Sequence, residues 1–186
     1  MSLILLRHTR PDVAEGVCYG RTDLLPADDF ETAASAVIAG LPDVSRVVTS
    51  PLVRCARLAE RIAAARDLDP ETDPRIIEMD FGSWERTAWN AIPRDELDAW
   101  AADFHGARPH GGESVAMLAA RVGAALDETE AADPPILWVT HAGVVRAACA
   151  ARAVERGWET RLDFGRWLVL PATGRDPSRT APSRYR

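Results

Sequence analysis

Short apolar runs alternate along this chain with longer segments in which apolar residues recur every three or four positions. A short apolar run between turn residues predicts a buried strand, and the longer spacing predicts a helix with one buried face. The predicted strands span residues 3–6, 46–49, 75–77, 136–139 and 166–170. The predicted helices span residues 30–39, 51–66, 113–129 and 144–153. This alternation predicts the α/β class, as a three-layer α/β/α sandwich around a mostly parallel sheet.

The helix over 51–66 has the clearest start signal in the chain. Ser50 is a favoured N-cap residue, because its hydroxyl can accept a hydrogen bond from the first turn. Pro51 suits the first helical position, where its missing N–H costs no hydrogen bond. We therefore expect Ser50 to cap this helix.

A single domain is predicted over residues 1–170. The 186-residue chain is 47% hydrophobic and 27% charged, which is an ordinary composition for one packed core. Residues 86–110 have weak periodicity and predict a small helical excursion or lid. Residues 171–186 are polar and contain several arginines, so we expect a C-terminal tail there. No apolar run reaches the roughly 18 residues of a membrane span, and signal-peptide features are missing, so we expect a cytoplasmic protein.

Charge and cysteine content exclude several classes of function. The net charge is −6, so we expect no nucleic-acid binding. All 22 basic residues are arginine, which excludes lysine Schiff-base chemistry and a Walker-type phosphate loop. The histidines lack metal-site spacing, so we expect no metal. The three cysteines, Cys18, Cys55 and Cys149, are far apart and are expected to be reduced, buried thiols.

Polar residues follow several of the predicted strands directly. In parallel sheets the ligand binds beyond the carboxyl ends of the strands, so residues at these ends should converge on one cleft. The strand-end residues are Arg7 with His8, Ser50 with Arg54 four residues on, Glu78, and His141. A single histidine at such a place is usually structural. Here two histidines, His8 and His141, follow equivalent strand ends, and each has an arginine nearby. The structural and the catalytic interpretation are therefore equally open.

This constellation suits a phosphoryl group. Guanidinium groups bind a phosphate dianion through paired donors, and Arg7 and Arg54 are the candidates. The helix that follows His141 offers backbone N–H groups to an anion. Nearby cations disfavour imidazolium, so His8 is expected to be neutral and able to attack phosphorus.

The reaction also needs an acid for the leaving oxygen. Glu78 lies among apolar residues and is the candidate, with Asp80 and Glu85 as competitors for the role. His105 lies within the 86–110 excursion and His110 at its edge, and both are expected to be structural.

The sequence resembles the histidine phosphatase superfamily, also called the phosphoglycerate mutase-like family. Four motifs in order resemble the family's RHG, SSPLxRAxxTA, ExxxGxWEG and VSHGGVIR segments, and a fifth resembles its GGES element. They are Leu5–Thr9, Thr49–Ala56, Glu78–Glu85, Val139–Arg146 and Gly111–Ser114.

The resemblance implies a role for each matching residue. His8 would be the phosphorylated nucleophile, and Glu78 the proton donor. Arg7, Arg54 and His141 would bind the phosphoryl group. No cofactor or metal is implied. The further substrate-binding candidates are Thr9, Gly20, Ala142 and Gly143.

The first motif departs from the family pattern, and this bears on the substrate. Thr9 replaces the family's glycine, and the usual ETxxN continuation is absent. Residues 7–25 are similar to the α-ribazole phosphatase subgroup. We expect a phosphomonoesterase that forms a phosphohistidine and acts on a small phosphorylated metabolite, with α-ribazole 5′-phosphate as the candidate substrate, as a monomer or homodimer. The alternatives are mutase-type phosphoryl transfer and a non-catalytic phosphate-binding relative.

Overall fold

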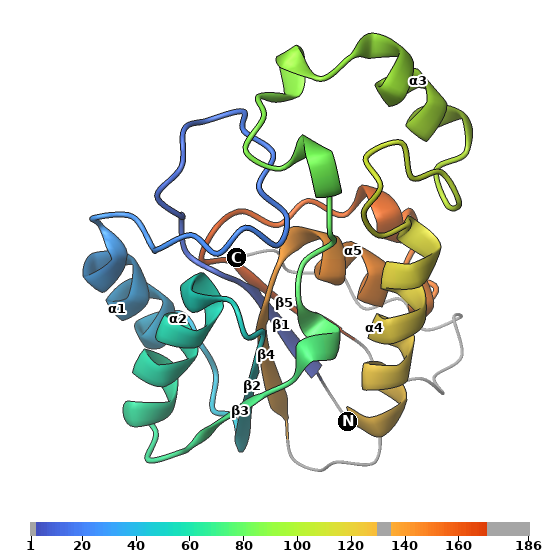
Figure 1. Ribbon diagram of the computed structural model, residues 1–186. Coiled ribbons are helices and arrows are strands. Elements are labelled where there is room, and N and C mark those ends of the chain that lie inside the picture. Colours follow the sequence, from blue (N-terminus) through green and yellow to red (C-terminus); the bar gives the residue numbers. More distant parts are fainter. Residues whose placement is uncertain (1–2, 130–134, 171–186) are drawn as a thin grey trace.

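The computed structural model describes residues 3–129 and 135–170, which build a five-stranded sheet of order β3-β2-β4-β1-β5 (Figure 1). The strands are β1 (Leu3–Arg7), β2 (Arg46–Thr49), β3 (Pro70–Thr72), β4 (Ile136–Thr140) and β5 (Trp167–Leu170). Strand β5 pairs antiparallel with β1, and the other three pairings are parallel. The predicted α/β class with a mostly parallel sheet is confirmed.

Helices cover both faces of the sheet. Helices α1 (Phe30–Gly40) and α2 (Val53–Ala64) lie on one face, and α4 (Val115–Thr129) and α5 (Ala142–Ala151) on the other (Figure 1). Successive side chains of a strand point to opposite faces. In β1, Leu3 and Leu5 accordingly join the core under α4 and α5, while Ile4 and Leu6 join the core under α1 and α2. The sandwich thus has three layers.

After strand β3 and the 3₁₀ turn η1 (Pro74–Ile76), the chain makes an excursion above the carboxyl ends of the strands before it reaches α4 (Figure 1). The helices of the excursion are the 3₁₀ turns η2 (Gly82–Trp84) and η3 (Trp89–Ala91), followed by α3 (Arg94–Ala102). Cys18, Trp84 and Ile92 form a small core of their own beneath it. Residues 86–110 thus contain the helices expected there, and their action as a lid stays a prediction.

The predicted strand over 75–77 is wrong. These residues follow strand β3 and include the end of turn η1, which begins at Pro74. The carboxylate of Asp73 accepts the Arg75 N–H at 2.8 Å, which favours a turn over a ladder. Strand β3 begins at Pro70 and lies at the edge of the sheet, the position at which a strand tolerates proline. Glu78 therefore follows a 3₁₀ turn and a short loop, not a strand.

The predicted cap of α2 is also wrong. The helix begins at Val53 with Leu52 as its N-cap residue. Its Val53 N–H donates to the Asp23 carboxylate at 2.8 Å, so a distant side chain does the capping. The Ser50 hydroxyl accepts the N–H of Leu52, one residue before the helix, at 3.4 Å, and it lies 2.7 Å from Nε2 of His141.

Other expectations differ only slightly or lie outside the described residues. Helix α2 ends two residues earlier than predicted, and α4 and α5 each begin two residues from the predicted start. The expected tail over 171–186 lies outside the described residues. The three cysteines are free and buried, as predicted. Within residues 3–129 and 135–170 no helix has the length and apolar character needed to cross a membrane.

Candidate active site

Two histidines meet where the central strands end. Strands β1 and β4 are parallel neighbours, with Arg7 opposite Thr140, so the next residue of each strand is a histidine. The ring centroids of His8 and His141 are 5.1 Å apart, and both side chains are almost fully buried. Strand pairing alone therefore brings together two residues 133 positions apart, which supports the convergence expected from the sequence.

The environment of His8 leaves one ring nitrogen available for reaction. Its Nδ1 lies 2.6 Å from the carbonyl oxygen of Thr9. A carbonyl oxygen only accepts hydrogen bonds, so Nδ1 carries the proton. In the neutral ring Nε2 then keeps its lone pair, so Nε2 is the atom that can act as a nucleophile.

Both histidines are held in the neutral form. Burial is the largest cause that lowers the pKa of His8 well below its ordinary value, and the Arg54 and Arg7 guanidinium groups lower it further. The Thr9 carbonyl opposes this shift. Burial also lowers the pKa of His141 well below its ordinary value, with His8 and Arg54 adding to the effect. Neutral His8 near pH 7 was expected, and its surroundings support it.

The two candidate phosphate-binding arginines come from different elements, Arg7 from β1 and Arg54 from α2. Arg54 is fully buried in the first turn of α2, and it donates from Nη2 to the Gly20 carbonyl at 2.7 Å and from Nη1 to the Thr22 carbonyl at 2.8 Å. Arg7 donates from Nη1 to the Leu162 carbonyl at 2.8 Å, and its guanidinium lies 3.8 Å from the centroid of the Phe164 ring. These contacts hold each guanidinium in one orientation.

Each of these arginines also has a donor without a partner. The Nε groups of Arg7 and Arg54 are buried and have no hydrogen-bond partner in the described part of the chain. A buried N–H group without an acceptor is costly, so native proteins usually pair such groups. Two orphan donors beside His8 suit a site whose anion completes the hydrogen bonding.

Glu78 is fixed against the start of helix α5. Its Oε2 accepts the Gly143 N–H at 3.1 Å, and its Oε1 accepts the Met79 N–H at 2.8 Å. Gly143 is the second residue of α5, directly after His141 and Ala142. A Cβ atom at position 143 would come closer to Oε1 of Glu78 than the 3.0 Å that real Cβ atoms keep. Glycine at this position therefore makes room for the carboxylate.

Charged side chains hold the backbone of Glu78 in place. Glu113 pairs with Arg121 through two hydrogen bonds, at 2.7 Å to Nε and 2.8 Å to Nη2. Arg21 completes the group with Nη2 3.4 Å from Glu113. Both arginines donate to the Glu78 carbonyl oxygen, Arg21 at 3.2 Å and Arg121 at 3.1 Å. We call Arg21, Glu113 and Arg121 the clamp.

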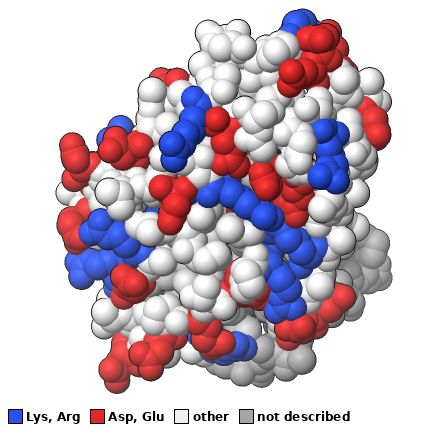
Figure 2. Space-filling model, viewed as in Figure 1, with Lys and Arg blue, Asp and Glu red and all other residues white. Residues whose placement is uncertain are grey.

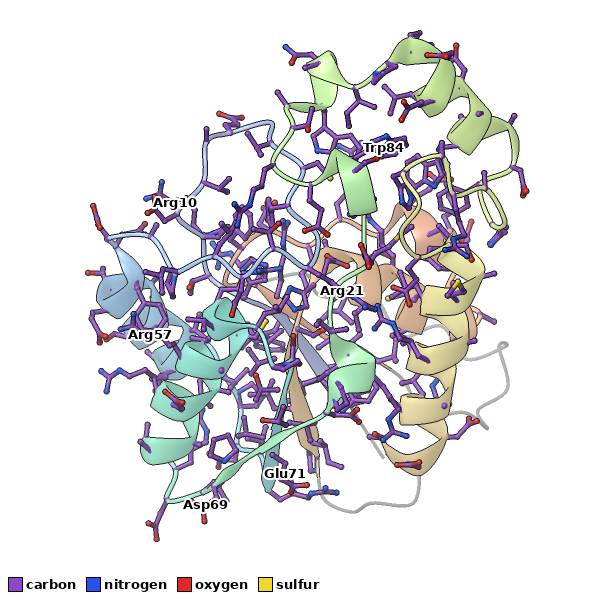
Figure 3. All side chains as sticks on the ribbon, in the orientation of Figure 1. Arg10, Arg21, Arg57, Asp69, Glu71 and Trp84 are labelled. Atoms are coloured by element: carbon purple, nitrogen blue, oxygen red, sulfur yellow. The ribbon has the colours of Figure 1, made fainter. Side chains whose placement is uncertain are left out.

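Of the clamp, Arg21 is the most exposed residue, with 38% of its side chain accessible. Figure 3 places the labelled Arg21 in the middle of the molecule, between α2 and α4. Figure 2 shows basic side chains in the middle of this face with acidic side chains around them, in keeping with the net charge of −6.

The loop that carries Gly20 is held by a second acid. Oε1 of Glu85 accepts the Arg21 N–H at 2.8 Å, and Oε2 accepts the Thr22 N–H at 2.6 Å. Gly20 has a positive φ of 35°, and a Cβ there would lie 2.7 Å from the Met79 carbonyl oxygen. Glu85 therefore positions the loop whose carbonyl oxygens accept hydrogen bonds from Arg54. Glu85 itself lies away from the start of α5, where Glu78 is bound.

A cavity of about 240 Å³ opens beside Glu78. Its polar floor contains Arg7, Glu78, Ala142 and Gly143, and Gly20 also lines it. Much of the remaining wall is aromatic, and the rings are Tyr19, Phe81, Trp89, Trp100, Phe104 and Trp158. The cavity therefore joins two of the candidate residues, Arg7 and Glu78, to an apolar compartment, whereas His8, Arg54 and His141 are not among the residues that line it.

The other candidates from the sequence are placed as follows. The Thr9 carbonyl binds His8, while its side chain lines a separate hollow beside Arg10. His110 is buried against the Trp84 ring, with ring centroids 4.7 Å apart, and accepts the Gly112 N–H on Nδ1. His105 is exposed. No group of three or more His, Cys, Asp or Glu residues within the described ranges could hold a metal ion.

Sequence reasoning missed the clamp, although one signal for it was present. Leu118 and Val122 are buried on α4, and Arg121 lies between them on the same side of the helix. A charged residue on an apolar helix face predicts a buried partner. The partner, Glu113, lies in the segment noted only for its resemblance to the GGES element.

Comparisons with known proteins show the family of this chain. A family model described as the histidine phosphatase superfamily (branch 1) matches residues 3–178. The glucosyl-3-phosphoglycerate phosphatase of Mycobacterium tuberculosis is 29% identical over 188 residues, covering 92% of this chain and 81% of the relative. The adenosylcobalamin/alpha-ribazole phosphatase of Escherichia coli is 30% identical over 133 residues, covering 67% of this chain and 65% of the relative.

A comparison with solved structures agrees with the sequence comparisons. The solved structure of a mycobacterial glucosyl-3-phosphoglycerate phosphatase matches with a TM-score of 0.78 at 25% identity, over 90% of this chain and 88% of that chain. With the family model matching nearly its whole length, the chain belongs to the histidine phosphatase superfamily.

Proposed function

We propose that this protein is a metal-independent phosphomonoesterase that works through a phosphohistidine on His8. The observation that carries the proposal is the state of His8: a buried, neutral ring with Nδ1 bound to a carbonyl, beside His141 and two arginines with unpaired Nε donors. Neutral imidazole is the nucleophilic form, and the surrounding donors suit the charge of a phosphoryl group in transit.

The reaction takes place in two steps. Nε2 of His8 attacks phosphorus, the bond from phosphorus to the ester oxygen breaks, and Glu78 in its protonated form gives a proton to the departing alkoxide. A water molecule then attacks the phosphorus of phosphohistidine, and Glu78 takes its proton. The P–N bond breaks, inorganic phosphate leaves, and neutral His8 is restored. Arg7, Arg54 and His141 stabilise the charge on the phosphoryl oxygens in both steps.

Glu78 suits the acid role because of its place. It lines the cavity in which the leaving alcohol would lie, and it is bound at the start of α5, next to His141. The competing acids are committed elsewhere: Glu85 to the backbone of the Gly20 loop, and Asp80 to the Gly82 N–H at 2.8 Å.

We propose α-ribazole 5′-phosphate as the substrate to test first. The similarity to the E. coli adenosylcobalamin/alpha-ribazole phosphatase supports this choice. The similarity to glucosyl-3-phosphoglycerate phosphatase makes that phosphorylated sugar acid the second compound to test. A small metabolite as partner and a monomeric or homodimeric state stay predictions.

The mechanism is tested with p-nitrophenyl phosphate in EDTA. We expect hydrolysis by the wild-type protein, loss of activity in His8→Ala, and activity in the control His105→Ala, which removes an exposed histidine outside the site. Activity that requires added metal, or that survives His8→Ala, would refute the mechanism.

The role of Glu78 needs a second comparison. Glu78→Gln should slow hydrolysis of alkyl phosphates by about 100-fold or more, the usual scale of general acid catalysis, and affect p-nitrophenyl phosphate much less. A good leaving group departs without a proton. Equal losses on both substrates would exclude Glu78 as the acid.

A further inference from the structure

The ring of His141 has one proton to donate, and its position on the ring decides what the residue can do. Burial, with His8 and Arg54 nearby, keeps the pKa of His141 well below its ordinary value, so the ring is neutral. A neutral imidazole has a single N–H, and its other nitrogen only accepts. The proposed reaction requires His141 to stabilise phosphoryl oxygens, which a neutral ring does only through that N–H.

The hydroxyl of Ser50 lies against one of the two ring nitrogens. Its Oγ is 2.7 Å from Nε2 of His141, and both side chains are fully buried. Ser50 directly follows β2, and its backbone N–H donates to the Val139 carbonyl at 3.0 Å, which continues the pairing of β2 with β4. His141 directly follows β4. Strand pairing therefore holds the hydroxyl beside the ring.

The surroundings of the hydroxyl indicate which of the two groups donates. The Ser50 oxygen already accepts the Leu52 N–H at 3.4 Å, and its one proton needs an acceptor. Within the described residues the acceptors beside it are Nε2 of His141 and the sulfur of Cys55. A thiol sulfur is a weak acceptor, whereas the lone pair of a neutral imidazole is a good one. The hydroxyl proton therefore belongs on the side of Nε2.

The thiol of Cys55 is the other group in contact with this ring, and its own proton points elsewhere. Sγ lies 3.4 Å from Nε2 and 3.9 Å from Nδ1 of His141, and 3.6 Å from the Thr140 carbonyl oxygen. A carbonyl oxygen only accepts, so the thiol proton faces Thr140. Burial raises the pKa of Cys55, so the thiol keeps this proton. In the described part of the chain no nitrogen or oxygen atom pairs with Nδ1.

We propose that Ser50 is a positioning residue that donates its hydroxyl proton to Nε2 of His141 and thereby holds the ring proton on Nδ1. The hydrogen bond made at one ring nitrogen sets the protonation of the other. The Nδ1–H group is then the donor that His141 offers to the phosphoryl group. This inference rests on the proposed phosphomonoesterase function and deepens it by naming the residue that prepares His141 for its role.

The position of the ring proton can be measured without a substrate. Long-range proton–nitrogen correlation spectra of protein labelled with ¹⁵N-histidine distinguish a protonated ring nitrogen from a bare one. The His141 signals are those missing from His141→Gln. At pH 7 we expect the wild type to carry the proton on Nδ1, and Ser50→Ala, in which Nε2 has lost its donor, to distribute it over both nitrogens. A proton on Nε2 in the wild type, or an unchanged spectrum in Ser50→Ala, would overturn the inference.

Two further spectra test the parts of the argument separately. Cys55→Ala is the matched control, because it removes the other buried group in contact with the ring, and His141 should keep its proton on Nδ1. A proton that moves in this variant would assign the role to the thiol instead. Inorganic phosphate added to the wild type should shift the Nδ1–H signal of His141, and the absence of a shift at saturating phosphate would contradict its role as the phosphoryl donor.

Kinetics connect the hydroxyl to the reaction. Ser50→Ala should lower kcat/KM about 10- to 100-fold, less than the loss of a whole transition-state donor, because part of the population keeps the correct proton. The loss should be equal for p-nitrophenyl phosphate and for an alkyl phosphate, since His141 acts on the phosphoryl group and not on the leaving oxygen. In a His141→Ala background the same replacement should change kcat/KM by less than about 2-fold. Full additivity of the two losses would overturn the inference.

The outcomes separate this inference from the function on which it rests. The spectra of the free protein report the ring proton whether or not the protein hydrolyses phosphomonoesters. Activity that disappears in His8→Ala supports the phosphomonoesterase even if the ring proton is found on Nε2. If Ser50→Ala fails to fold, the wild-type spectrum and the phosphate titration decide the case.

Discussion

The replacement Glu113→Gln tests whether the clamp positions Glu78, the proposed acid. The Glu113 side chain is 7% exposed, and its two oxygens accept from Nε and Nη2 of Arg121, whose side chain is 16% exposed. An amide offers one acceptor oxygen and no charge. The variant therefore leaves a buried guanidinium without its counter-charge.

The size of the expected loss in folding stability follows from this burial. Removing one partner of a buried ion pair costs about 3–5 kcal/mol. We expect the lower end, about 3 kcal/mol, because Arg121 keeps hydrogen bonds to the carbonyls of Arg75, Ile77 and Glu78. For a chain of this size the melting temperature should fall by about 6–12 °C.

Activity should change in a way that destabilisation alone does not explain. Arg121 and Arg21 both donate to the Glu78 carbonyl, so loosening them should misplace the acid. We expect kcat/KM to fall about 10-fold more for an alkyl phosphate than for p-nitrophenyl phosphate at a temperature where the variant is folded. Arg121→Lys, which keeps the charge but not the paired geometry, should show the same selectivity.

The assay combines thermal unfolding followed by circular dichroism with kinetics on both substrates. Glu128→Gln is the matched control, since Glu128 is an exposed partner of Arg75, and Arg75 keeps Asp73 at 2.8 Å. That variant should keep the wild-type melting temperature and substrate ratio. An unchanged melting temperature in Glu113→Gln would refute the energetic reasoning, and equal losses on the two substrates would refute the positioning role.

Three further predictions concern other parts of the site. Gly143→Ala should preserve the fold, because alanine suits a helix, but push aside the flexible end of Glu78 and so slow alkyl phosphates selectively; unchanged kinetics would contradict this. Stability should fall as the pH drops below about 6.5, because the histidines of the unfolded chain then bind protons that the buried, neutral histidines of the folded protein do not. Melting temperatures measured between about pH 5 and 8 test this. A melting temperature that rises on acidification would contradict the lowered pKa values of His8, His110 and His141. The cysteine thiols should resist a disulfide reagent until the protein unfolds, because burial raises the pKa of all three, that of Cys18 to about 12; rapid labelling of the native protein would contradict this.

Much of the fold could be predicted because its strongest signals are local. Strands β1, β2 and β4 are short apolar runs whose pattern needs no knowledge of neighbours, and the predicted ranges lie within one residue of the observed ones. The pairing of His8 with His141 was also predictable. It follows from the rule that parallel strands present their carboxyl ends at the same edge of a sheet.

Other features depend on contacts that no local pattern contains. Strand β3 starts with proline and exists because it pairs with β2. The cap of α2 comes from Asp23, 30 residues before the N–H that it accepts. Glu78 is oriented by Gly143, 65 residues away. Such partners are chosen by folding, so sequence spacing does not reveal them.

The sequence by itself determined the layers of the sandwich, the carboxyl ends of β1, β2 and β4 and the types of residue available there, because these depend on hydrophobic periodicity and on side-chain chemistry. Only the tertiary structure decided which donors surround His8, how the clamp holds Glu78 and that aromatic rings from four separate segments enclose one cavity. These depend on distances between side chains far apart in the chain, and only the packed fold sets such distances.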